Sequence, residues 1–178
     1  DDLKSLFSAG NNQGRLLMMV RHPVLRAISV HYYGGSKLSL DEYSKSPEVQ
    51  NNYLTRFLTG KLGGTLDETH VQTAKDIMAA KFVVGIYHNL DTSLQRFEDY
   101  FHWKAVGSTV HCRDDAILRA QGLDTGIAHL AEQARESEAW TYLSYNNRFD
   151  MELYTYSKKL FREQKQMFRD LKLRRGDE

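Results

Sequence analysis

Two short, uninterrupted apolar runs stand out in the pattern of hydrophobic and polar positions. RLLMMV (15–20) follows the turn-like segment AGNNQG, and KFVVGIY (81–87) follows a stretch with helical spacing. Continuous apolar runs of this length are typical of strands that are buried on both faces. Both runs are therefore predicted to be strands, each followed by a helix.

Most of the remaining chain has the spacing of amphipathic helices. Pro23 suits the first turn of a helix that ends before Gly34, since proline lacks the N–H that would be unpaired there. Ser39 and Glu42 form a capping-box pattern. The predicted helices cover 23–33, 40–45, 48–59, 67–80, 91–102, 113–121, 126–136 and 147–172, with an irregular loop at 104–112. Two strand–helix units in a helix-rich chain predict part of an α/β layer fold.

The helix expected over 23–33 carries an apolar and a polar face. Steps of three and four residues place Leu25, Ile28 and Tyr32 together, and this face is predicted to pack into the core. The neighbouring face carries Arg26, Ser29, Val30 and Tyr33. In the last predicted helix, the apolar stripe is interrupted only at Gln164.

Composition narrows the classes of protein without naming one. The 178 residues are most economically one domain, and 41% hydrophobic with 26% charged residues is ordinary for a globular protein. The net charge of +1 provides no general field for nucleic acid, so any anion site must be local. Cys112 is the only cysteine, which excludes an internal disulfide. No apolar run approaches the roughly 20 residues of a membrane-spanning helix.

The junction between the first strand and its helix is the candidate site. In open α/β sheets, ligands bind beyond the carboxyl ends of the strands, and Arg21 follows the first strand directly. Its guanidinium can bind a phosphate through two hydrogen bonds, and the Ser29 hydroxyl can donate another hydrogen bond. The alternative is structural: Ser29 bonds back to the Leu25 carbonyl, and Arg21 is a surface charge.

The histidines and the cysteine show no metal-binding or catalytic pattern. None of the seven histidines belongs to an H-E-x-x-H motif and there is no C-x-x-C, so no metal site is predicted. His22 and His88 follow the two strands and are expected to border the edge of the sheet. His31 points away from the direction of Ser29 and is expected to be packed or on the surface.

Four segments resemble carbohydrate sulfotransferases of the heparan sulfate 2-O/6-O kind. MVRHPVLRAISVHYY is similar to their R-x-P-x-x-R-x-x-S segment, and NNYLTRFLTG to a downstream N-x-x-T-R-x-L-x-G piece. FVVGIYHNLDTSLQRFEDYFHW resembles a later strand, turn and helix, and NNRFDMELYTYSKKLF resembles the closing helix with its N-x-x-D-x-x-L-Y pattern. The segments occur in the family's order and together cover most of residues 15–165.

The resemblance implies a P-loop-like parallel sheet with flanking helices, and transfer of a sulfuryl group from PAPS (3′-phosphoadenosine 5′-phosphosulfate) to a hydroxyl of a glycosaminoglycan-like carbohydrate. Arg21 and Ser29 would hold the donor's 3′-phosphate, with Arg26 bracing the loop or adding charge. Tyr33 would lie near the acceptor sugar. A donor-contacting loop would lie near Gly107. The donor carries its own activation, so no metal is required.

The chain also departs from the family. The strand, Gly-rich loop and Lys that hold the 5′-phosphosulfate have no counterpart here, and none of the 20 residues before Arg21 is the catalytic His. We therefore expect residues 1–178 to form one partial sulfotransferase domain, incomplete at its N-terminus, that holds no catalytic residue and does not turn over alone. In eukaryotes such enzymes are type II membrane proteins of the Golgi, with the catalytic domain in the lumen.

Three further questions stay open from the sequence. The chain is either part of such an enzyme or a non-catalytic, degenerate module that binds an anionic ligand or a partner chain; a kinase-like transferase fits less well, because ATP lacks a 3′-phosphate. Thr55 and Arg56 either brace the core or contact the acceptor. The basic residues from Ser157 onward form either a solvated face and tail or a surface for a polyanionic glycan.

Overall fold

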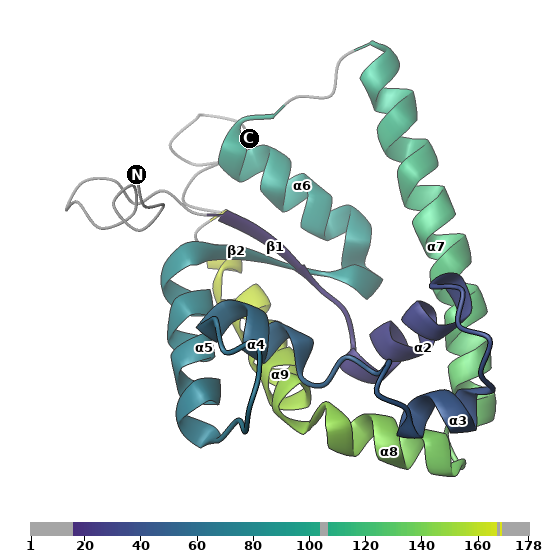
Figure 1. Ribbon diagram of the computed structural model, residues 1–178. Coiled ribbons are helices and arrows are strands. Elements are labelled where there is room, and N and C mark those ends of the chain that lie inside the picture. The colour runs from purple at the N-terminus through teal and green to yellow at the C-terminus, as the bar shows by residue number, and fades with distance from the viewer. Residues whose placement is uncertain (1–15, 104–106, 167, 169–178) are drawn as a thin grey trace.

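The computed structural model describes residues 16–103, 107–166 and 168. Strands β1 (Leu16–Val20) and β2 (Phe82–Ile86) form a parallel pair in which Leu16 lies opposite Phe82 and Val20 opposite Ile86. Helices surround this pair, which makes the described part an α/β fold (Figure 1). The helices are α2 (Pro23–Tyr33), α3 (Leu40–Lys45), α4 (Tyr53–Thr59), α5 (Glu68–Lys81), η1 (Tyr87–Asn89), α6 (Leu90–Phe101), α7 (Ser108–Ala134), α8 (Glu138–Asn146) and α9 (Arg148–Glu163).

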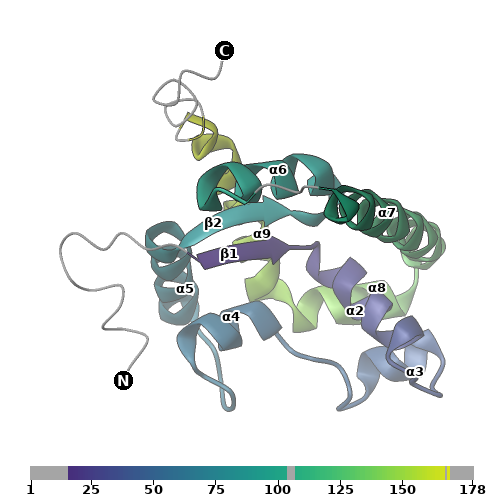
Figure 2. The ribbon, with the colours of Figure 1, turned by 90° about the horizontal axis from the view of Figure 1, so that it is seen from above.

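Helices cover both faces of the strand pair, as a parallel sheet requires. Figure 2 shows α6 on one side of the pair and α4 and α5 on the other, and buried residues of α9 join the apolar cluster that includes α5. Met18 and Val84 pack toward α5 and α9 in one apolar cluster, whereas Val83 packs against Phe97 of α6 in another. Every residue of β2 is buried. The two apolar runs are therefore strands as predicted.

A separate apolar cluster joins α2 to α3, α7 and α8. The buried face of α2 consists of Val24, Ala27, Ile28 and His31. Ile28 was expected in the core and lies there, but the prediction for Tyr32 is wrong, since its side chain is 45% exposed. The core face is rotated toward His31 because Tyr43 of α3 supplies an aromatic ring 4.9 Å from the His31 ring.

Gly85 permits the close approach of α6 to β2. A β-carbon at this position would lie 2.6 Å from Cζ of Phe97 and 2.9 Å from Cβ of Ser93. Contacts this short do not occur between real side chains, so any larger residue would push α6 away from the sheet.

Side chains satisfy the hydrogen-bonding groups on the edge of β2 that faces away from β1. The Gln164 amide donates from Nε2 to the Phe82 carbonyl at 2.8 Å, and its Oε1 accepts from the Val84 N–H at 2.9 Å. The Ser93 hydroxyl accepts from the Ile86 N–H at 2.9 Å. The polar interruption in the last apolar stripe is thus a buried amide that takes the place of a neighbouring strand.

One long helix replaces a predicted loop and two predicted helices. The single helix α7 includes residues 108–112, which were expected in a loop, and the predicted helix 113–121. It also includes the predicted helix 126–136 as far as Ala134. The break expected near Gly122 and Gly126 does not occur. A glycine inside a helix costs only about 1 kcal/mol, and packing of Ile127 and Ala131 against α2 compensates for this cost.

The other helices differ from the predictions mainly at their ends. The helix expected over 48–59 begins only at Tyr53, because Asn52 has left-handed backbone angles (φ 46°, ψ 50°). Helix α8 was not predicted; Ser137 caps its start by accepting from the Trp140 N–H. The last element matches to Glu163, and its predicted end at 172 lies outside the described residues. No described helix combines the length and the apolar character needed to cross a membrane.

Candidate functional site

Arg21 lies at the carboxyl end of β1 and packs on an aromatic ring from the neighbouring strand's end. Its guanidinium carbon is 4.7 Å from the centre of the Tyr87 ring, and Tyr87 follows β2 directly. Since the two strands are parallel, both ends lie at the edge where α/β proteins bind ligands. The half-buried Arg21 is held there by a cation–π contact, unlike a fully solvated surface charge.

A cavity of about 80 Å³ lies beside Arg21, between the end of β1 and the starts of α2 and α4. It is smaller than the roughly 300–1,000 Å³ of complete small-molecule sites, so it can take only part of a ligand. Its lining includes both arginines of the Arg-Pro segment and one buried carboxylate. The lining residues are Met19, Val20, Arg21, Pro23, Arg26, Tyr53, Leu54 and Asp150.

Ser29 and Tyr33 lie on the side of α2 that faces away from the core. The half-buried Ser29 hydroxyl makes no hydrogen bond to the Leu25 carbonyl in the described part of the chain, and Ser29 is not among the residues that line the cavity beside Arg21. Tyr33 is 59% exposed, and its hydroxyl lies 4.0 Å from the position that a β-carbon would occupy on Gly126 of α7. A ligand at this face could reach both hydroxyls.

Arg26 braces the segment that leads into α4. Its Nη2 donates to Oε1 of Gln50, and its guanidinium carbon lies 4.1 Å from the centre of the Tyr53 ring. These contacts tie α2 to the segment before α4. The guanidinium also remains part of the small cavity beside Arg21, where its charge adds to the positive potential.

The two asparagine-containing segments that resemble the family contact each other through their polar side chains. The Asp150 carboxylate accepts from the Leu54 N–H at 2.8 Å, the Thr55 N–H at 2.8 Å and the Thr55 hydroxyl at 2.7 Å. In return, Oδ1 of Asn52 accepts from the N–H groups of Phe149 at 2.9 Å and Asp150 at 3.2 Å. We call this reciprocal contact between the starts of α4 and α9 the Asn52–Asp150 clasp.

The clasp assigns Thr55 a bracing role. Arg56 braces the following loop, and its side chain also lines a surface cavity, so contact with an acceptor stays open for Arg56. Thr55 is fully buried in the clasp, and the Arg56 guanidinium donates to backbone carbonyls, among them that of Lys61 at 3.0 Å. Burial raises the pKa of Asp150, while its hydrogen bonds and the charge of Arg26 act in the opposite direction. The clasp was not predicted from the sequence. The only local signal for it was the Asn-Asn pair that precedes both α4 and α9.

His22 lies at the same edge of the sheet, at the start of α2. Its ring packs edge-on against Tyr154, with centres 5.2 Å apart, and its Nδ1 is buried without a hydrogen-bond partner in the described part of the chain. Burial lowers the pKa of His22, and the charges of Lys158 and Arg135 lower it further. His22 is therefore neutral near pH 7. His88 is exposed at the end of β2, 3.3 Å from the Tyr154 hydroxyl.

The other candidate groups do not converge on a site in the described residues. His31 was expected to be either packed or on the surface, and its ring is packed against those of Tyr32 and Tyr43. No group of three or more potential metal ligands occurs within the described ranges. Cys112 is exposed on α7. Gly107 directly precedes α7, whereas the side chains of residues 108 and 109 lie outside the described structure, as does most of the basic tail.

Three comparisons with known proteins found no relative. No family model matches the chain, and neither a curated protein nor a solved structure matches it. The case for a family therefore rests on the four sequence segments, and the case for a function rests on the geometry at the edge of the sheet.

Proposed function

We propose that this chain provides the 3′-phosphate-binding part of a P-loop-like sulfotransferase that transfers a sulfuryl group from PAPS to a hydroxyl of a carbohydrate acceptor. The observation that carries the proposal is the position of Arg21 at the carboxyl edge of the parallel strand pair, beside a small cavity that Arg26 also lines. The Arg21 guanidinium stacks on Tyr87 at this edge, and the helix that follows carries the half-buried Ser29.

The side chains of Arg21 and Ser29 suit a phosphate dianion. Arg21 can form two parallel hydrogen bonds to phosphate oxygens. Because the Tyr87 ring already restricts the orientation of the guanidinium, less conformational entropy is lost when a phosphate binds. Ser29 lies beyond the first turn of α2, so the free amides of the helix start cannot serve at this point and the hydroxyl must donate. Arg26 adds a second positive charge within the same cavity lining.

The chemistry follows from the donor that such a site would hold. A base removes the proton from the sugar hydroxyl as its oxygen attacks sulfur, and the bond between sulfur and the 5′-phosphate oxygen breaks. Positive groups stabilise the charge that collects on the leaving phosphate. Tyr33, exposed one turn beyond Ser29, would lie near the acceptor. By the same family resemblance, the enzyme would work in the Golgi lumen.

Calorimetric titration of adenosine 3′,5′-bisphosphate into the folded protein tests the donor site. We expect binding that adenosine 5′-monophosphate does not reproduce, because the 3′-phosphate provides the contact. Arg21→Ala should weaken it about 10- to 100-fold, since a hydrogen bond to a charged group contributes about 1.5–3 kcal/mol. Ser29→Ala should have a smaller effect in the same direction. Arg119→Ala, which removes an exposed arginine from α7, is the matched control.

Binding of the bisphosphate that survives Arg21→Ala, or that the monophosphate matches, would refute the assigned role of Arg21. A protein that shows no 3′-phosphate-dependent binding would instead favour the alternative, a non-catalytic sulfotransferase-like module that binds another anionic ligand or a partner chain.

A further inference from the structure

Two exposed aromatic side chains lie side by side on the outer face of α4. The ring centres of Tyr53 and Phe57 are 6.1 Å apart, and their planes are within 13° of parallel. Tyr53 is 42% exposed and Phe57 is 61% exposed. Aromatic side chains each carry a large apolar surface that proteins ordinarily bury, so an exposed stacked pair indicates a surface that something else covers.

A cavity of about 390 Å³ lies against these rings, within the range of small-molecule sites. Leu62, whose side chain is 82% exposed, also lines it. We call Tyr53, Phe57 and Leu62 the aromatic platform. The lining residues are Gln50, Asn51, Tyr53, Arg56, Phe57, Leu62 and Gly63.

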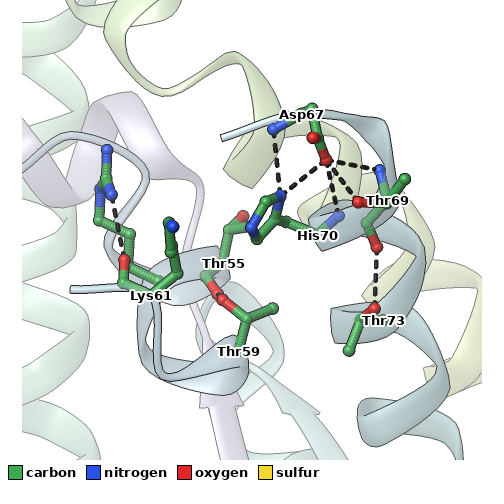
Figure 3. Close-up of polar contacts among 8 residues, drawn as sticks. Thr55, Thr59, Lys61, Asp67, Thr69, His70 and Thr73 are labelled. Carbon is green, nitrogen blue, oxygen red and sulfur yellow. Dashed lines mark hydrogen bonds and ion pairs between the residues drawn. The ribbon is translucent and has the colours of Figure 1, made fainter. Parts of the chain in front are cut away.

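The loop that carries Leu62 is held in place from both sides. Arg56 donates to the carbonyls of Lys61 and Gly64, each at 3.0 Å, and to the carbonyl and side chain of Asn51 at 3.0 and 3.2 Å. Asp67 then caps the start of α5, accepting from the N–H and hydroxyl of Thr69 (Figure 3). The cavity wall is therefore preformed, which lowers the entropy lost when a ligand binds.

Polar and positive groups surround the platform. Gln50 and Asn51 place side-chain amides at the cavity, and among the described residues that line it Arg56 alone carries a charge. Arg26 lies 4.1 Å from the Tyr53 ring centre and adds a second positive charge. This combination fits a ligand with apolar faces, hydroxyl groups at its edges and a negative substituent.

We infer that the aromatic platform binds one sugar ring of an anionic carbohydrate chain, the acceptor class of the proposed function, on which this inference rests. The C–H faces of a pyranose pack on Phe57 and Leu62, and its hydroxyls bond to the amides of Gln50 and Asn51. A carboxylate or sulfate is attracted by Arg26. Tyr53 lines both this cavity and the small cavity beside Arg21, so the chain runs from the platform toward the edge of the sheet.

Binding of a heparosan hexasaccharide, in which glucuronic acid alternates with N-acetylglucosamine, tests the platform. Calorimetry or saturation-transfer NMR should show that Phe57→Ala weakens binding about tenfold, because it removes an apolar contact of roughly 50–60 Å². Leu118→Ala, which truncates a 66% exposed leucine on α7, is the matched control and should leave binding unchanged. Neutral cellohexaose should bind more weakly than the anionic chain. Circular dichroism of both variants confirms that they fold.

Adenosine 3′,5′-bisphosphate separates this inference from the proposed function. Phe57→Ala should leave the affinity for the bisphosphate unchanged, whereas Arg21→Ala should lower it. Hexasaccharide binding that Phe57→Ala does not change overturns the platform and leaves the donor site standing. Phe57-dependent hexasaccharide binding without bisphosphate binding supports the platform and overturns the donor site. A dimer in light scattering that Phe57→Ala dissociates overturns the platform, because a second copy would then cover it.

Discussion

Removing the Asp150 carboxylate should destabilise the protein severely, because it joins the starts of two helices from distant parts of the chain. In Asp150→Ala, two N–H groups and the Thr55 hydroxyl lose their acceptor. A buried donor left without a partner costs about 1–3 kcal/mol. Leu54 is half-buried, so water can reach its N–H in part, whereas Thr55 is fully buried. We expect a loss of about 3–4 kcal/mol, a large part of the 5–15 kcal/mol of a typical domain.

Urea unfolding monitored by circular dichroism measures this loss. With a slope of about 1–3 kcal/mol per molar urea, the midpoint should fall by about 1 M or more. Asp150→Asn keeps one acceptor oxygen and should lose about half as much. Asp115→Ala, which removes an exposed aspartate from α7, should stay within about 0.5 kcal/mol of the natural protein.

The reciprocal half of the clasp gives an independent test. Asn52→Gly removes the side-chain oxygen but tolerates the left-handed backbone, whereas Asn52→Ala loses the oxygen and adds about 1 kcal/mol or more of backbone strain. Alanine should therefore be the worse substitution. A loss below about 1 kcal/mol for Asp150→Ala, or an Asn52→Gly variant as stable as the natural protein, would refute the assignment of these costs to the clasp. Equal stability of the two Asn52 variants would refute the backbone strain at this position.

Three further predictions concern the core and its pH dependence. Gly85→Ala should lower the unfolding free energy by about 1–3 kcal/mol, because its β-carbon would overlap Phe97; a neutral result in urea unfolding would contradict the close approach of α6. Gln164→Leu should lower the free energy of unfolding by about 2–4 kcal/mol, since the Phe82 carbonyl and the Val84 N–H of β2 lose their partners. Faster hydrogen exchange of the Val84 amide in this variant would confirm the cause. Burial lowers the pKa of His31 from 6.5, so the unfolded chain takes up more protons and the free energy of unfolding should fall as the pH drops below about 6.5. Urea unfolding from pH 7.5 to 5 should show a smaller fall for His31→Leu than for the natural protein. An equal fall in both would refute this role of His31.

Local patterns predicted the elements that depend on neighbours in the sequence. The strands were recognisable as continuous apolar runs, Pro23 and the Ser39–Glu42 capping box correctly marked the starts of α2 and α3, and Arg21 was correctly placed at the end of a strand. These features depend on interactions within about four residues, which the sequence displays directly. The assignment of Arg21 and Ser29 to a phosphate rests on their positions, and the choice of the donor's 3′-phosphate rests on the resemblance; both stay predictions.

Contacts between distant residues decided the remainder. The clasp pairs groups 95 to 98 positions apart, and it moved the start of α4 to Tyr53 by holding Asn52 in left-handed angles. The continuous α7 and the rotated core face of α2 likewise depend on packing partners, Ile127 for one and Tyr43 for the other. The sequence by itself determined the two strands, the starts of α2 and α3, and which arginine follows the first strand. Only the tertiary structure determined α8, the continuous α7, the buried faces and the exposed platform on α4, because burial and hydrogen-bond satisfaction are properties of the packed chain.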